Sequence, residues 1–132
     1  MADKKLINAL KTVAMSRGTI IVDENLQDLR QYLMNLNIRV RLPPQGMSDK
    51  KIAEDYLPNR VFVTNNSKDF LKFAILYDIG IIATEKIKSK NPEDLAEIIS
   101  DAIIDYSLWG QKSGFLLTLM NGGKHQFKVL TD

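Results

Sequence analysis

The stretch Thr19-Ile20-Ile21-Val22-Asp23-Glu24-Asn25 decides the fold class of this chain. The apolar run Ile20-Ile21-Val22 has no polar residue that could face solvent. Such a run is typical of a strand that is buried on both faces of a parallel sheet. The run stops at two acids and an amide, and leucines at helical spacing follow it at Leu26, Leu29, Leu33 and Leu36. A buried strand that leads directly into an amphipathic helix is the repeating unit of an α/β fold.

The same unit recurs along the chain. Further strands are expected at 38–42, 61–63 and 79–83, and helices at 48–57 and 91–106. A polar turn over 64–70 is expected to open another helix, which runs to about Tyr77. The tail differs, because apolar stretches on either side of Asn121-Gly122-Gly123 predict a C-terminal β-hairpin over 114–130. The sequence therefore predicts a three-layer α/β/α sandwich with a mainly parallel sheet and a C-terminal hairpin.

The chain has 132 residues, no cysteine and one histidine. This length is typical of one domain, so we expect 1–132 to be a single domain, with an N-terminal helical extension over 1–17. The lack of cysteine excludes a disulfide framework, a thiolate zinc site and a cysteine nucleophile. A lone histidine excludes a multi-histidine metal site. Any metal would have to be held by oxygen ligands.

The charges are nearly balanced, with 18 basic and 16 acidic residues and a net charge of +2. This balance does not indicate a basic nucleic-acid module, although it leaves nucleic acid open as a substrate. The first residues lack the continuous apolar core of a signal peptide, and no run approaches the roughly 18 apolar residues of a membrane span. We therefore expect a cytoplasmic protein with no membrane partner.

Acidic and amide side chains collect just after the predicted strands. In parallel sheets, ligands bind at the carboxyl ends of the strands, so these positions matter most. If Asp23, Asp49, Asn66 and Asp69 converge there, they form a cluster that either takes up protons or binds a cation. With oxygen ligands the cation would be Mg²⁺ or Mn²⁺, and a metal held in this way supports the hydrolysis of phosphodiesters.

Three motifs carry a family resemblance. The stretch 20–26 is similar to the start of short bacterial PIN-like proteins, in which a hydrophobic strand ends in Asp-Glu-Asn-Leu. Ser48-Asp49-Lys50-Lys51-Ile52 resembles their Ser-Asp-x-x-Ile helix start. The stretch 61–70 resembles the Thr-x-Asp/Asn-x-x-Asp-Phe signature of PIN domains, including VapC-type toxins. The order and the spacing of the motifs agree over about 19–106.

The resemblance implies a PIN-like sheet and a Mg²⁺- or Mn²⁺-dependent endoribonuclease, used in many members as the toxin of a toxin–antitoxin pair. Carried over by position, Asp23, Asp49, Asn66 and Asp69 are the metal ligands, and the three aspartates are the catalytic residues. Thr64 orients them through hydrogen bonds. An antitoxin protein and a homodimer are partners implied by the resemblance.

Other residues have candidate supporting roles. Glu24 is a second acid beside the first strand end. Arg39 and Arg41 share one side of a predicted strand, and Lys68 lies within the third motif, so these three are candidate contacts for RNA phosphates. Alternating lysines at 86, 88 and 90 are a further basic group, although such a loop is more often simply solvated.

Structural interpretations remain open beside the functional ones. Asp23 suits a turn cap, and Asp49 suits a first helical turn, where a carboxylate is stabilised by the helix dipole. Asn66 and Asp69 suit an Asx turn with a helix start. No Glu lies between Asn25 and Asp49, and Asn66 stands where many PIN domains carry Asp.

These gaps motivate a second hypothesis, a catalytically reduced PIN-like module for binding or assembly. A response-regulator receiver is a third hypothesis, because Val22-Asp23-Glu24-Asn25 resembles the first acidic motif of that family. It ranks low, since an amide follows the third strand where a receiver needs its phosphoacceptor aspartate.

Overall fold

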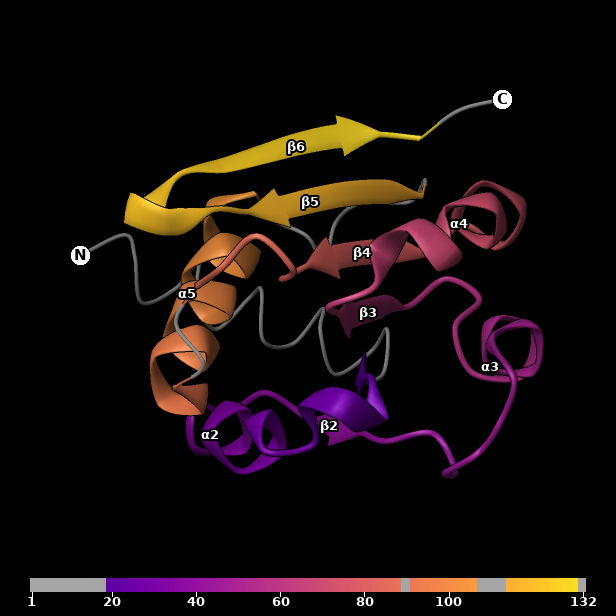
Figure 1. Cartoon of the computed structure of the whole chain (residues 1–132), viewed down its shortest axis with the longest axis horizontal. Helices are drawn as coiled ribbons and strands as arrows, with labels where there is room; N and C mark the ends of the chain where they lie inside the picture. The colour runs from indigo at the N-terminus through magenta and orange to yellow at the C-terminus, as the bar shows by residue number, and fades with distance from the viewer. Residues whose placement is uncertain (1–18, 89–90, 107–113, 131–132) are drawn as a thin grey trace.

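The computed structural model describes residues 19–88, 91–106 and 114–130. Within them one six-stranded sheet runs through the molecule in the order β2-β1-β3-β4-β5-β6 (Figure 1). Neighbouring strands are parallel from β2 to β5, and β6 is antiparallel to β5. The strands are β1 (Ile20–Val22), β2 (Val40–Arg41), β3 (Val61–Thr64), β4 (Gly80–Ala83), β5 (Phe115–Leu119) and β6 (His125–Val129).

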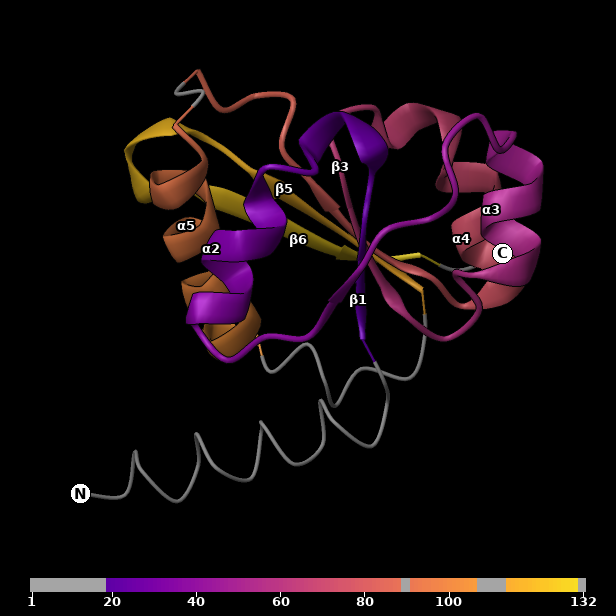
Figure 2. The same ribbon diagram turned by 90° about the horizontal axis from the view of Figure 1, so that it is seen from below.

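Helices cover both faces of this sheet. In Figure 2 the helices α2 and α5 lie on one side of the strands, and α3 and α4 lie on the other. The predicted three-layer α/β/α sandwich with a mainly parallel sheet and a C-terminal hairpin is therefore confirmed. The helices are α2 (Leu29–Asn35), α3 (Asp49–Asp55), α4 (Leu71–Tyr77) and α5 (Pro92–Asp105), and the short 3₁₀ turns are η1 (Glu24–Leu26), η2 (Ser67–Asp69) and η4 (Asn121–Gly123).

The first strand shows why both layers are needed. Successive side chains of a strand point to opposite faces, so Ile20 and Val22 pack in the core under α2 and α5, whereas Ile21 packs in the core under α3 and α4. All three side chains are at most 1% exposed. A strand without polar residues is stable only in this position, between two layers of helix.

Local capping explains where two of the helices begin. The Ser48 hydroxyl accepts a hydrogen bond from the backbone N–H of Lys51 (3.2 Å), which starts α3 directly before Asp49. The Asn91 side chain caps α5 in the same way, and proline occupies the first turn of that helix. Both starts agree with the sequence prediction.

The second predicted helix is shorter than the leucine spacing indicated. Leu26 lies in η1, α2 begins only at Leu29, and the chain turns at Asn37, whose φ is 65°. Leu36 consequently caps the helix and is 37% exposed. The expected strand over 38–42 pairs only at Val40 and Arg41, opposite Ile20 and Ile21 of the short strand β1, its one neighbour in the sheet.

Two expectations fall outside the described residues, namely the helical extension over 1–17 and the lysine at 90. Among the helices that the structure describes, none is both long and apolar enough to cross a membrane.

Gly80 marks a close approach between two strands. A Cβ atom built on this residue would lie 2.1 Å from Cε2 and 2.3 Å from Cζ of Phe115, its partner on β5. The Phe115 ring in turn contacts Phe127 on β6, with the ring centroids 5.4 Å apart. Only a residue without a side chain leaves room for this ring.

We expect Gly80→Ala to lower the free energy of unfolding by about 1–3 kcal/mol, because the added methyl group overpacks the core against Phe115. Urea denaturation measures this loss. Adding Phe115→Leu to Gly80→Ala removes the clashing ring atoms, so the double variant should be less destabilised than the sum of the two single variants. Additive effects would mean that the two residues do not contact each other as described.

Candidate functional site

A buried hydroxyl joins the ends of two neighbouring strands. Thr64 is the last residue of β3 and is fully buried. Its Oγ1 donates a hydrogen bond to Oδ2 of Asp23 (2.8 Å) and accepts one from the backbone N–H of Asn66 (3.0 Å). This contact arises because β1 and β3 pair in parallel with Val22 opposite Val63, so both strands end at the same edge. Thr64 thus orients the Asp23 side chain through a hydrogen bond.

Asp23 has two roles at once. Its Oδ1 accepts a hydrogen bond from the backbone N–H of Asn25 (3.3 Å) and caps η1, as the structural interpretation expected. Its Oδ2 receives the Thr64 hydroxyl. An ionised carboxylate has about four lone-pair sites, so these two hydrogen bonds leave room for a further donor or a cation. The turn cap and a metal-binding role are therefore compatible.

Asn66 and Asp69 contact each other across η2. The Nδ2 group of Asn66 donates a hydrogen bond to Oδ2 of Asp69. Asn66 precedes η2 without capping it through its side chain, so the Asx-type cap expected as the structural alternative is not what holds this turn. The amide side chain instead fixes the orientation of the carboxylate three residues later.

The structure brings Asp49 into the electrostatic field of the same edge. Partial burial raises the pKa of the Asp49 carboxyl, and the negative charges of Asp69 and Asp23 raise it further. The positive charge of Lys72 acts in the opposite direction. Negative charges at the end of β1 and in the turn after β3 therefore act on the Asp49 carboxyl at the start of α3, although the three groups are distant in the sequence.

Glu85 and Lys72 belong to this region and were missed as site residues. The Oε2 atom of Glu85 accepts hydrogen bonds from Oγ (2.5 Å) and from the backbone N–H (3.3 Å) of Ser67 in η2. The position of Glu85 after the fourth strand was a usable signal in the sequence. Lys72 lies in α4, three residues after Asp69, and nothing in the sequence showed which residues that helix would face.

The remaining predicted residues are less closely tied to this edge. Glu24 lies exposed in η1, and Lys68 lies exposed in η2 between Asn66 and Asp69. Arg39 and Arg41 are exposed at the edge strand β2. The guanidinium group of Arg41 lies 4.9 Å above the ring centre of Tyr56, so part of its charged surface is already in contact with protein.

The donor set at this edge suits a hydrated divalent cation. Its members offer carboxylate oxygens, which Mg²⁺ and Mn²⁺ prefer, and the like charges around Asp49 would be offset by a cation. Over residues 19–88, 91–106 and 114–130, no group of three or more His, Cys, Asp or Glu side chains is placed to hold a metal ion. An ion bound here would therefore keep several of its waters, as Mg²⁺ commonly does.

Comparisons with known proteins found no relative of this chain. No family model matches the chain, and neither a curated protein nor a solved structure matches it significantly.

We expect Thr64→Val to lower the free energy of unfolding by about 1–3 kcal/mol, because it leaves Asp23 and the N–H of Asn66 without their buried partner. Urea denaturation at neutral pH measures the loss. Thr118→Val on β5 makes the same chemical change at a half-buried position and serves as the control. Equal losses in the two variants would show that the Thr64 hydroxyl has no special role.

The pKa of Asp49, measured by NMR titration of its carboxyl carbon, should lie above the ordinary value of 3.8. Because the folded state holds this proton more tightly than the unfolded state, the contribution of Asp49 to stability falls as pH rises from 3.8 through the raised pKa. Asp69→Asn removes a negative charge and should lower the Asp49 pKa, whereas Lys72→Gln should raise it. A pKa insensitive to both variants would contradict the shared field.

Proposed function

We propose that this protein is a metal-dependent ribonuclease of the PIN-like type, which hydrolyses RNA phosphodiesters at the carboxyl edge of its sheet with Mg²⁺ or Mn²⁺. The observation that carries the proposal is the hydrogen bond by which the buried Thr64 hydroxyl orients Asp23, at an edge where the negative charges of Asp23 and Asp69 raise the pKa of Asp49. Structural carboxylates are usually paired with a cationic group, whereas the negative charges of Asp69 and Asp23 raise the pKa of the Asp49 carboxyl.

Each side chain has a part in this chemistry. When bound, the metal ion supplies a water of lowered pKa and shields the phosphate oxygens. Asp23 is the most firmly oriented ligand, because Thr64 and the N–H of Asn25 hold its two oxygens. Asp69 is held by Asn66. Asp49, whose raised pKa makes it a better proton acceptor than an ordinary aspartate, is suited to take a proton from the attacking water.

One observation favours the alternative of a catalytically reduced binding or assembly module. The described acids do not form a compact group of three, and the charge of Lys72 already compensates Asp49 in part. Such a module would bind no divalent ion at this edge. The two proposals therefore differ in metal binding as well as in cleavage.

The resemblance in the three motifs extends the proposal to partners and location. It supports a cytoplasmic toxin that is neutralised by an antitoxin protein, in a chain that forms a homodimer. Glu24 would support the acidic site, and Arg39, Arg41 and Lys68 would contact phosphates of the RNA outside the cleavage point. Their exposure is consistent with these roles.

The test is cleavage of a labelled single-stranded RNA in Mn²⁺. Asp23→Asn should lower the rate at least about 10²-fold, because it weakens both the metal site and its electrostatic effect. Asp101→Asn, at an exposed position of α5, makes the same charge change and should leave the rate unaltered. EDTA should abolish cleavage by the native protein.

Thermal denaturation separates the two proposals. Binding of Mn²⁺ at about 100 times its Kd should stabilise the native protein by roughly 2.7 kcal/mol, and Asp23→Asn should remove most of this gain. Stabilisation without RNA cleavage would contradict the nuclease. An unchanged melting temperature together with no cleavage would favour the reduced module.

A further inference from the structure

The loop after β4 is fastened to the turn of the C-terminal hairpin. Nδ2 of Asn121 donates a hydrogen bond to the carbonyl oxygen of Lys86 (3.3 Å), and the backbone N–H of Lys88 donates one to Oδ1 of Asn121 (3.0 Å). One exposed side chain in η4 therefore holds both ends of a three-residue segment that lies more than thirty residues earlier in the sequence. This gives the exposed loop a defined shape.

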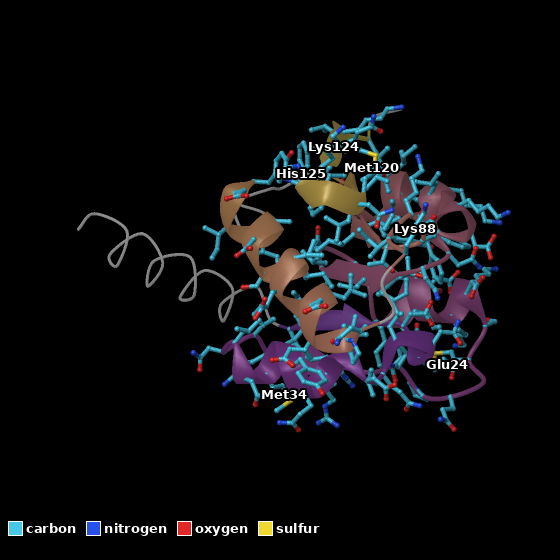
Figure 3. All side chains as sticks on the ribbon, turned by 60° about the vertical axis from the view of Figure 1, so that its left-hand side comes forward. Glu24, Met34, Lys88, Met120, Lys124 and His125 are labelled. Carbon is cyan, nitrogen blue, oxygen red and sulfur yellow. The ribbon has the colours of Figure 1, made fainter. Side chains whose placement is uncertain are left out.

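The clamped segment presents lysines to solvent on either side of a buried residue. Ile87 is 5% exposed and packs in the core under α2 and α5, so Lys86 and Lys88 on either side of it project outward. Lys124 follows the hairpin turn and is exposed as well. In Figure 3, which turns the carboxyl end of the parallel strands toward the viewer, Lys88 and Lys124 both project on this side. We call Lys86, Lys88, Lys124 and the turn Gly122-Gly123 the basic arm.

The hairpin turn between these lysines is open. Gly122 and Gly123 have φ values of 74° and 73°, and no atom lies within 4 Å of the position that a Cβ would take on either residue. A backbone without side chains lets an extended ligand approach closely. The basic arm therefore combines exposed lysines, two of them on a backbone segment held by Asn121, with an unobstructed surface.

The basic arm begins directly beside the acidic site. Glu85, the residue before Lys86, accepts two hydrogen bonds from Ser67, and Ser67 lies between Asn66 and Asp69. Carboxylates repel the phosphates of RNA, so an acidic nuclease site needs cationic groups next to it to hold the strand. The adjacent exposed lysines can supply this charge.

We propose that the basic arm binds the phosphodiester backbone of the RNA strand that leads from the acidic site, and that Asn121 is its positioning residue. This inference rests on the proposed ribonuclease function. The basic arm consists of lysine and glycine and is held by Asn121. It has no aromatic or arginine anchor of the kind that dominates protein interfaces, so its chemistry favours RNA over an acidic protein. Phosphate contacts need only exposed cations and an open path.

The test measures RNA binding without cleavage. Anisotropy of a labelled single-stranded RNA is followed in EDTA over a salt series, with every variant made in the Asp23→Asn background. Lys86→Gln/Lys88→Gln should raise Kd about tenfold and reduce the slope of log K against log salt by about 1.4, since each contact to single-stranded RNA contributes about 0.7. Lys51→Gln/Lys128→Gln removes the same charge from α3 and β6 and should change neither quantity.

Asn121→Ala tests the positioning role. It should accelerate hydrogen exchange of the Lys88 N–H and raise Kd about threefold, while the salt slope changes little because no cation is lost.

Unchanged Kd and slope in the double lysine variant would overturn the proposal. Equal affinity for a poly-glutamate peptide of matching charge would overturn it too, in favour of an acidic protein partner.

The outcomes also separate this inference from the function on which it rests. If Mn²⁺-dependent cleavage is observed but the lysine variants bind RNA normally, the proposed role of the basic arm is wrong and the proposed nuclease function is supported. If RNA binding depends on the lysines but neither cleavage nor Mn²⁺ binding occurs, the proposed role of the basic arm is supported and the proposed nuclease function is wrong.

Discussion

The hydrogen bond from the Thr64 hydroxyl to Asp23 is the contact on which the site depends. It exists only because β1 and β3 are adjacent, parallel and in a register that brings their carboxyl ends together. That adjacency in turn requires helices on both faces, since every side chain of these two strands is buried. The packing of the core therefore determines where the first acid of the site lies, and a buried polar group without its partner would cost free energy.

Around this contact, acidic side chains and lysines lie next to one another along the same edge of the sheet. The negative charges of Asp23 and Asp69, which follow β1 and β3, raise the pKa of Asp49 at the start of α3. Lys86, Lys88 and Lys124 lie beyond Glu85, at the ends of β4 and β5. A parallel sheet naturally produces such an arrangement, because each strand delivers its following loop to the same edge. In our proposal the acidic half holds a cation and the basic half holds phosphates, which are the two components of a metal-assisted reaction on RNA.

Much of the fold followed from local patterns. Ile20-Ile21-Val22 predicted a strand buried on both faces, Ser48 predicted the start of a helix, and Asn121-Gly122-Gly123 predicted the hairpin, and the structure has each of them. The predictions were wrong where tertiary contacts limit an element. Leucine spacing extended the helix to Leu36, although the chain turns there, and 38–42 pairs over two residues only, with the short strand β1 as its one neighbour.

The sequence by itself determined the layer architecture and the positions where acids follow strands, because burial periodicity and capping are local properties of the chain. Only the tertiary structure decided which of those groups meet. The Thr64–Asp23 contact joins residues 41 positions apart, Ser67–Glu85 joins residues 18 apart, and Asn121 reaches back 33 and 35 positions to the loop after β4. The order of the strands brings such groups together, and that order depends on the packing of the whole sheet between its two helical layers rather than on any single segment.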